Sequence, residues 1–204
     1  MNKIKKLVTR SKSFSEFFNK YTNYLRQITE KINRDDLNNF FDVIDKARKK
    51  NRTIFVAGNG GSAANALTTE NDLGFDVLKR AKTKKTFRVM PLVSNPIILT
   101  SISNDISFDQ VFLNQLKIHY KRGDILLLLS GTGNSKNLIS AAKWVKKNKG
   151  TCIAVLGGKG GKLRKICNPC IIIKTEKDEF GPVEDSQLII KHSLSHWFQL
   201  KLKR

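Results

Sequence analysis

The sequence predicts a doubly wound α/β fold, with a five-stranded parallel sheet flanked by helices. Five short apolar runs, rich in β-branched residues, alternate with segments suited to helices from residue 53 onward. Such near-continuous apolar runs are typical of strands that are buried on both faces of a parallel sheet. The alternation is the pattern of repeated βαβ units, so the fold class follows from it.

Two helices are predicted before the sheet, within residues 13–49. Apolar side chains recur at three- and four-residue spacing from Phe14 to Ile32, which is the period of one helix face. Asp35 and Asp36 offer a start for the second helix, which carries its own apolar stripe. These helices form an N-terminal extension to the α/β core.

The elements of the core follow from the same patterns. The predicted strands are 53–57, 86–93, 124–130, 151–156 and 170–174, and the predicted helices are 62–80, 107–119, 135–148, 160–166 and 184–202. No linker, repeat or low-complexity tract interrupts them. We expect one domain, residues 1–204, with N-terminal helices in 1–50 and the α/β core with its C-terminal helix in 51–204.

Composition indicates a globular protein of a reducing compartment. The chain is 40% hydrophobic and 27% charged, and no apolar run approaches the roughly 18–20 residues of a membrane span. The cysteines are few and odd in number, which fits the cytosol. We therefore expect cytoplasmic localisation, no membrane contact, and a structural role for the C-x-x-C sequence at Cys167 and Cys170.

The chain is strongly basic. Its 38 Lys and Arg residues exceed its 17 Asp and Glu residues, and 38 − 17 gives a net charge of +21. Such an excess concentrates anions near the surface, whether sugar phosphates or nucleic acid. The basic residues are spread along the chain with few aromatic residues among them, so we do not expect a nucleic-acid partner.

Two loops rich in glycine and hydroxyl groups follow the first and third strands, at Gly58–Ser62 and Ser130–Ser135. Ligands of α/β folds bind beyond the carboxyl ends of the strands, and each loop precedes a helix whose free N–H groups favour an anion. Neither loop has the dinucleotide or P-loop pattern. A tight turn without a ligand explains either loop alone, but the pair favours a cradle for a phosphate monoester. The turn dipeptide Asn104–Asp105, after the second strand, is a third candidate contact.

The ordered motifs GNGGSAANA, SNDISF, LSGTGNS and GGKGGKL resemble the SIS (sugar isomerase) domain, and within it the phosphoheptose isomerases. The resemblance spans residues 10–202 and implies a sugar phosphate as partner, and a homotetramer with sites at subunit interfaces. It implies that the phosphate is bound by Ser130, Gly131, Thr132 and Ser135, and the sugar by Asn59, Gly60, Gly61, Ser62, Asn104 and Asp105.

This chain departs from the family's pattern at some of the catalytic positions. Where the family has a His and, four residues on, a Glu, this chain has Thr68 and Asp72; where it has a Gln and, eight residues on, a His, this chain has Glu184 and His192. The resemblance implies Asp72 and His192 as the acid/base pair and Glu184 as a substrate contact. Burial can raise the pKa of a carboxyl group toward the working pH, and either Asp185 or Glu184 could orient the imidazole.

The same positions bear on a metal. A threonine hydroxyl is a poor match for a zinc-binding imidazole, so Thr68 weakens any zinc site and leaves Asp72, Glu184 and His192 as its candidate ligands. No cofactor is required by the sequence.

Two functions are therefore open. The first is an aldose–ketose isomerase that converts sedoheptulose 7-phosphate to a heptose 7-phosphate through an enediol. The second is a non-catalytic SIS protein that binds a phosphosugar or a protein partner, like the SIS protein that partners the bacterial replication initiator. Asp72 and the sequence VED at 183–185 also resemble this second group, so Thr68 and Asp72 discriminate between the two.

Overall fold

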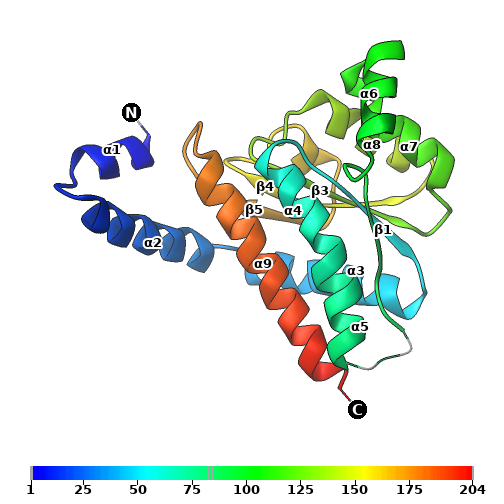
Figure 1. Ribbon diagram of the computed structural model, residues 1–204, viewed down its shortest axis with the longest axis horizontal. Coiled ribbons are helices and arrows are strands. Elements are labelled where there is room, and N and C mark those ends of the chain that lie inside the picture. Colours follow the sequence, from blue (N-terminus) through cyan, green and yellow to red (C-terminus); the bar gives the residue numbers. More distant parts are fainter. Residues whose placement is uncertain (1, 82, 84, 204) are drawn as a thin grey trace.

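The predicted fold class is confirmed by the computed structural model, which describes residues 2–81, 83 and 85–203 (Figure 1). One sheet of parallel strands runs in the order β2-β1-β3-β4-β5. The strands are β1 (Thr53–Ala57), β2 (Arg88–Pro91), β3 (Ile125–Ser130), β4 (Thr151–Gly157) and β5 (Cys170–Ile173). Each coincides with a predicted apolar run to within a few residues.

Helices cover both faces of the sheet. The helices are α1 (Lys3–Thr9), α2 (Phe14–Glu30), α3 (Arg34–Lys49), α4 (Gly61–Thr69), α5 (Asp76–Ala81), α6 (Pro96–Asp105), α7 (Val111–His119), α8 (Lys136–Lys147) and α9 (Phe180–Lys201). A π-helical segment, η1 (Glu70–Phe75), joins α4 to α5, and η2 (Phe108–Gln110) and η3 (Leu163–Lys165) are short 3-10 turns.

The two faces of the sheet carry separate hydrophobic cores. Along β1, Ile54 and Val56 point to one face and Phe55 and Ala57 to the other, because side chains alternate along a strand. The first face packs against α2, α3, α4, α5 and α9, and the second against α6, α7 and α8. All of β3 is buried, which explains its uninterrupted apolar sequence.

The helices differ from the prediction in several places. Helix α1 was not predicted, and the helix expected at 160–166 is only the 3-10 turn η3. Residues 96–105 form α6, to which the apolar pattern assigned no helix. Asn95 caps it by accepting hydrogen bonds from the N–H groups of Ile97 and Ile98, at 3.0 and 3.2 Å, and Pro96 takes the first helical position. The predicted helix 62–80 exists, but the wider turn of η1 interrupts it in the middle.

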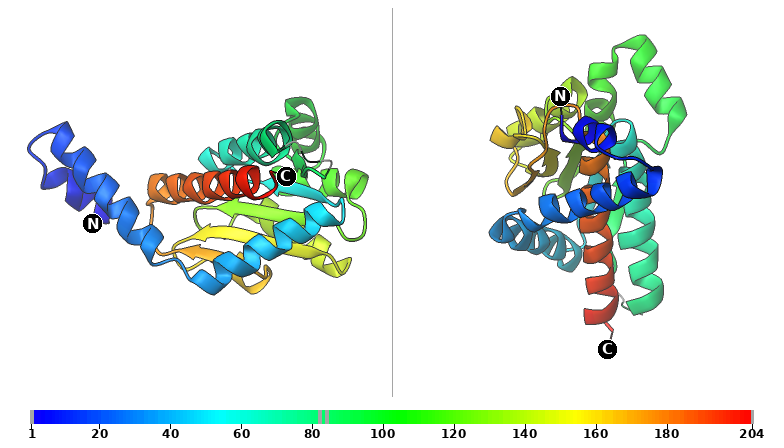
Figure 2. Two further views of the ribbon diagram at one scale, coloured as in Figure 1. Left: turned by 90° about the horizontal axis from the view of Figure 1, so that it is seen from below. Right: turned by 90° about the vertical axis from the view of Figure 1, so that its left-hand side faces the viewer.

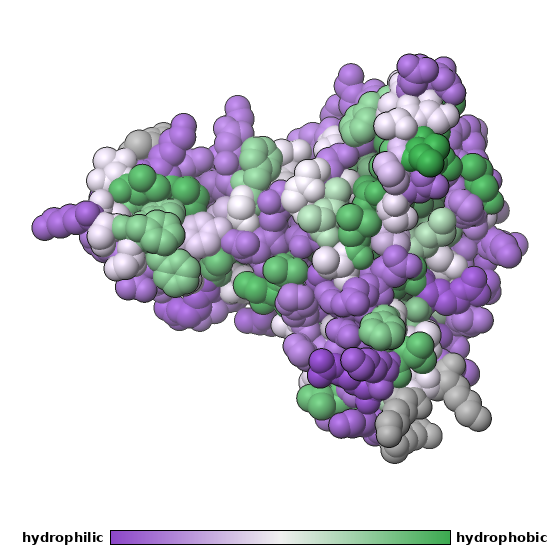
Figure 3. Space-filling view, viewed as in Figure 1, coloured by the Kyte–Doolittle hydropathy of each residue, from purple (hydrophilic) through white to green (hydrophobic). Residues whose placement is uncertain are grey.

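The N-terminal helices α1 and α2 form an arm that extends beyond the sheet (Figure 2). The arm is tied to the start of α9 by two tyrosines of α2. The hydroxyl of Tyr24 donates to Glu179 Oε2 at 2.6 Å, and that of Tyr21 donates to Asp185. Apolar side chains gather on the outer part of the arm, where Phe14 is 78% exposed and Phe18 54% (Figure 3).

The three cysteines are free thiols. Burial raises the pKa of Cys152 to about 12 and that of Cys170 to about 11, so these groups stay protonated near neutral pH. This environment fits the structural role expected of them. Within the described residues, none of the helices combines the length and apolarity that crossing a bilayer requires.

Candidate functional site

The two glycine-rich loops lie side by side at the carboxyl edge of the sheet, because β1 and β3 are neighbouring parallel strands. Asn59 of the first loop and Asn137 in the first turn of α8 exchange two hydrogen bonds. Asn59 Nδ2 donates to Asn137 Oδ1 at 3.1 Å, and Asn137 Nδ2 donates to Asn59 Oδ1 at 2.9 Å. The side-chain amide of Asn59 therefore links the loop after β1 to the start of α8.

The first loop leads into α4 under the carboxylate of Glu184. Gly60 has a φ of 54°, a conformation that favours glycine. A Cβ on Gly61 would collide with the carboxylate of Glu184, so the glycine leaves room for that carboxylate beside the loop. Among the predicted contacts, Ser62 departs from expectation. Its side chain is buried and donates to Gln187 Oε1 at 3.1 Å, which links α4 to α9, so its contact with the sugar stays a prediction.

The second loop keeps hydroxyl groups at the N-terminus of α8. Ser130 is buried, and its Oγ accepts the N–H of Gly133 at 3.0 Å, which leaves its own proton free to donate. Thr132 is exposed and Ser135 half-buried at the N-cap, where Ser135 makes no side-chain capping bond. Gly133, with a φ of 68°, backs against Gly160, since a Cβ there would meet its carbonyl oxygen at 2.0 Å. The loop at residues 158–161 thus supports the loop after β3.

Asn104 and Asp105 come after the second strand, as predicted, but a helix separates them from it. They follow β2 at the C-terminal end of α6, and both are exposed. Asn104 Nδ2 donates to Asp105 Oδ1 at 2.9 Å, so each side chain provides one hydrogen-bond partner for the other. No contact joins them to either glycine-rich loop among the hydrogen bonds of the described residues. Their role in binding substrate stays a prediction.

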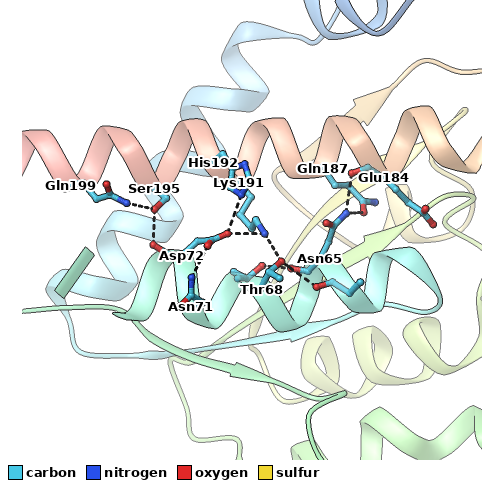
Figure 4. Close-up of polar contacts among 12 residues, drawn as sticks. Asn65, Thr68, Asn71, Asp72, Glu184, Gln187, Lys191, His192, Ser195 and Gln199 are labelled. Carbon is cyan, nitrogen blue, oxygen red and sulfur yellow. Dashed lines mark hydrogen bonds and ion pairs between the residues drawn. The ribbon is translucent and has the colours of Figure 1, made fainter. Parts of the chain in front are cut away.

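Asp72 lies in the π-helical segment and is held from several sides (Figure 4). Its Oδ2 lies 2.7 Å from Nζ of Lys191 and 3.4 Å from Nε2 of His192, both on α9. Its Oδ1 accepts the amide N–H of Asn71 at 3.0 Å, and its backbone oxygen accepts the hydroxyl of Ser195 at 2.6 Å. Asp72 is therefore fixed in orientation, with its side chain only 13% exposed.

The expected upward shift in the pKa of Asp72 is not found. Burial alone would raise this pKa, but hydrogen bonds from Lys191 and Asn71, together with the positive charges of Lys191 and His192, outweigh burial and hold it below the usual value. Asp72 is thus ionised at neutral pH. The side chain of His192 is 51% exposed, so it is the member of the pair that a ligand can reach.

The carboxylate that faces His192 is Asp72, and neither of the two candidates on α9 takes that place. Asp185 accepts the hydroxyl of Tyr21, and Glu184 lies against Gly61, eight residues before His192 and about 12 Å away along the helix axis. Burial, and to a lesser degree the negative charge of Asp185, raise the pKa of Glu184. Two carboxylates of the site region therefore have opposite pKa shifts.

The candidate zinc ligands are not brought together within one chain. Glu184 is too far along α9 to share an ion with Asp72 and His192, and across the described residues no three His, Cys, Asp or Glu side chains gather closely enough to bind a metal. Thr68 does not add a fourth metal ligand. Its hydroxyl accepts a hydrogen bond from Lys191 and donates into its own helix, to the carbonyl oxygen of Ala64 or Asn65.

Sequence reasoning missed Lys191, Gln187 and Asn137. Lys191 and Gln187 are buried and lie four residues apart on the apolar face of α9, between Val183 and Leu194. Polar residues within such a stripe are the signal that could have revealed them, because a buried polar group needs a partner. Nothing in the sequence pairs them with residues of α4, which lie about 120 positions earlier.

The chain is similar to known proteins over most of its length. Residues 16–157 match the family model described as SIS domain. A phosphoheptose isomerase of Rhodospirillum rubrum is 33% identical over 152 residues, which cover 74% of this chain and 78% of the relative. A phosphoheptose isomerase of Clostridium acetobutylicum is 30% identical over 168 residues, covering 80% and 83%.

Solved structures share the fold. A phosphoheptose isomerase of Neisseria gonorrhoeae superposes with a TM-score of 0.77 at 24% identity, covering 90% of this chain and 95% of the other. One from Francisella tularensis gives the same TM-score at 21% identity, covering 91% and 98%. At these identities the likeness concerns the arrangement of the chain alone.

Proposed function

The chain belongs to the SIS domain family, and from that premise we propose that it is a phosphoheptose isomerase that interconverts sedoheptulose 7-phosphate and a heptose 7-phosphate. One observation supports this most directly: two loops suited to a phosphosugar lie on neighbouring strands at one edge of the sheet, in a chain whose relatives bear that name. The non-catalytic alternative is not favoured, because the relatives that are 30–33% identical to this chain are named as enzymes.

The phosphate is bound by the loop after β3. Thr132 and Ser135 present hydroxyl groups at the N-terminus of α8, and Ser130 and Gly131 shape the loop below them. Hydroxyl donors and a helix N-terminus together favour a phosphate without a cation in the loop. The sugar lies toward Asn59, Gly60, Gly61 and Glu184, and Asn104 and Asp105 remain candidate contacts.

The reaction moves a proton between C1 and C2 of the sugar through an enediol. Asp72 and His192 form the acid/base pair, and the structure suggests a division of work between them. His192 is the exposed member, so its imidazole takes the proton from C1 and returns it to C2. The oxygen at C2 gains a proton as the enediol forms and the oxygen at C1 loses one as the aldose forms, both by exchange with solvent. Asp72, ionised and fixed by its neighbours, orients that imidazole and stabilises it when protonated.

A complete site requires two copies of the chain. The phosphate loop packs against Phe180 at the start of α9, and His192 lies twelve residues later, about 18 Å along the axis. This is longer than one sugar phosphate, so the phosphate loop of one copy faces the acid/base pair of another. The exposed apolar side chains of the arm and of α9 supply surface for such an assembly, which we propose to be a cytoplasmic homotetramer.

The test is turnover of sedoheptulose 7-phosphate by the purified protein, followed by NMR or mass spectrometry. Appearance of the aldose, with exchange of one carbon-bound hydrogen with solvent, is expected from an enediol mechanism. If the protein binds the sugar phosphate but neither isomerises it nor exchanges its hydrogen, the protein is a binding module and the proposal is wrong.

A further inference from the structure

Lys191 is the one cation inside the region that the proposed reaction uses, within the described residues (Figure 4). Its side chain is only 7% exposed. Its Nζ lies 2.7 Å from Asp72 Oδ2 and donates to the hydroxyl of Thr68. The ammonium therefore bridges Thr68 and Asp72, two of the three positions at which this chain departs from its family.

Burying an ammonium group is costly, and it needs compensation from every side. The neighbours of Lys191 on the same face of α9 are Gln187, Ile190 and Leu194, and an apolar residue would continue that stripe. A lysine that served packing alone would keep its charged end in water, as lysines on helix surfaces do. Here the charged end is turned inward, onto Thr68 and Asp72.

The side chains around Asp72 do not fit a zinc ion. Zinc is bound by imidazole, thiolate or carboxylate groups that have lost their protons. At this position the chain offers a threonine hydroxyl, and the Asp72 oxygen that a metal would take, Oδ2, already faces the ammonium of Lys191. A divalent cation on that oxygen would meet the positive charge of Lys191 at close range, which opposes binding.

We propose that Lys191 takes the place of a metal ion: its ammonium supplies the fixed positive charge beside Asp72, and the site works without a metal. Lys191 is a positioning residue, since its ammonium holds the carboxylate of Asp72 in place beside His192. Its effect on turnover rests on the proposed isomerase function. The claim that the charge of Lys191 replaces a metal does not rest on the isomerase function, because zinc binding can be measured without substrate.

The first experiment measures Zn²⁺ binding by calorimetry in three proteins: wild type, Thr68→His, and Thr68→His with Lys191→Ala. Wild type and the single variant are expected not to bind Zn²⁺, because the ammonium of Lys191 still lies against Asp72 Oδ2. The double variant is expected to bind at least about tenfold more tightly than the single variant, because an imidazole is added and the competing charge is gone.

Three results would overturn the proposal: stoichiometric Zn²⁺ binding by wild type, equal affinity of the single and double variants, or a folded double variant that binds no Zn²⁺. Circular dichroism establishes folding in each case.

The second experiment measures turnover of sedoheptulose 7-phosphate, with and without a chelator. Wild-type kcat is expected to be unchanged by the chelator. Lys191→Met should lower kcat by about ten- to a hundredfold with little change in KM, and Lys191→Arg should recover part of the loss because it keeps the charge. Lys147→Met, at an exposed lysine near the end of α8, is the matched control.

The two arms separate the possible failures. Absence of wild-type turnover would contradict the proposed function and leave the zinc comparison to decide on Lys191. Turnover that the chelator abolishes, or that Lys191→Met leaves intact, would contradict the role of Lys191 while the isomerase function stands. If the double variant does not fold, this second arm decides.

Discussion

Asn59 and Asn137 exchange a pair of amide hydrogen bonds, 3.1 and 2.9 Å long, that join the sugar loop after β1 to the helix that begins at the phosphate loop after β3. Each loop is short and carries glycine, so neither is stiff by itself. The amide pair holds the loop after β1 against α8, and with it the distance between the proposed phosphate and sugar positions.

We expect Asn137→Ala to weaken substrate binding and stability together. The change leaves the amide of Asn59 without its partner at a half-buried position, which costs about 1–3 kcal/mol of unfolding free energy. Thermal unfolding and calorimetric titration with sedoheptulose 7-phosphate measure the two effects. Asn148→Ala is the control, because Asn148 also donates one amide hydrogen bond, to Trp144 O at 2.8 Å, but is exposed at the end of α8. Equal effects of the two variants would contradict the coupling of the loops.

The phosphate assignment predicts that Ser130→Ala combined with Ser135→Ala abolishes affinity for phosphosugars. Ser135→Ala alone should weaken binding and keep stability, because its hydroxyl makes no capping bond. Ser130→Ala alone should also cost about 1 kcal/mol of stability, since its Oγ accepts the N–H of Gly133. Calorimetry with inorganic phosphate and with the sugar phosphate measures binding, with Ser140→Ala on the same helix as control. Unchanged affinity in the double variant would place the phosphate elsewhere.

The tetramer is predicted to depend on apolar side chains that one chain leaves in water. Trp197 is 52% exposed and Phe18 54% exposed, on α9 and on the arm respectively. We expect light scattering to give the mass of four chains for wild type, and Trp197→Glu or Phe18→Glu to lower that mass, because a charge is costly in an apolar interface. Lys201→Glu, near the end of α9, changes charge without removing an apolar group. A wild-type monomer at micromolar concentration would contradict shared sites.

The framework of the fold could be predicted from the sequence because its signals are local. The strand Thr53–Ala57 is an apolar run that Gly58 ends, and its bounds in the structure are the predicted ones. The start of helix α6 could be predicted, since Asn95 followed by Pro96 is a helix start signal. The helix itself could not, because its apolar pattern is weak. Local sequence thus predicts the bounds of an element with a strong apolar pattern well, but it misses a helix whose pattern is weak.

The candidate site was less predictable, because its contacts join distant segments. The loops could be found as glycine clusters after strands, but the burial of Ser62 against Gln187 depends on how α4 packs on α9. The pKa of Asp72 depends on Lys191, which comes from an apolar-looking face of another helix. Such pairings carry no period or spacing, so only the packed structure reveals them.

The ion pair of Asp72 and Lys191 predicts how stability changes with pH. The pKa of Asp72 is lower in the folded protein than its usual value of 3.8, so the charged form adds stability above that value. This contribution is lost as the pH falls through the folded-state pKa. Wild type should therefore exceed Asp72→Asn in unfolding free energy by about 1–3 kcal/mol at pH 7, and the difference should shrink below about pH 4.

Chemical denaturation from pH 3 to pH 7 measures this difference. Asp105→Asn is the control, because Asp105 is exposed on α6. A gap between wild type and Asp72→Asn that is constant across this range would mean that the carboxyl group contributes through packing and not through its charge.

The catalytic assignment is tested at Asp72 and His192 themselves. Asp72→Asn keeps the size and the hydrogen bonding of the side chain but removes its charge, so the imidazole loses its orienting carboxylate and kcat should fall by roughly a hundredfold or more, with little change in phosphosugar affinity. His192→Gln removes the proton carrier and should cost at least as much. The two losses should not add in the double variant, because both residues serve one proton transfer.

His196→Gln is the matched control, since His196 is exposed one turn further along α9 and has no assigned role. Turnover that survives in Asp72→Asn would remove Asp72 from the mechanism while leaving the fold and the phosphate site as they are. Turnover that survives in His192→Gln but not in Asp72→Asn would make the carboxylate itself the base. That outcome would require its pKa to rise when substrate excludes water, because a carboxylate held by Lys191 is a weak base in the free protein.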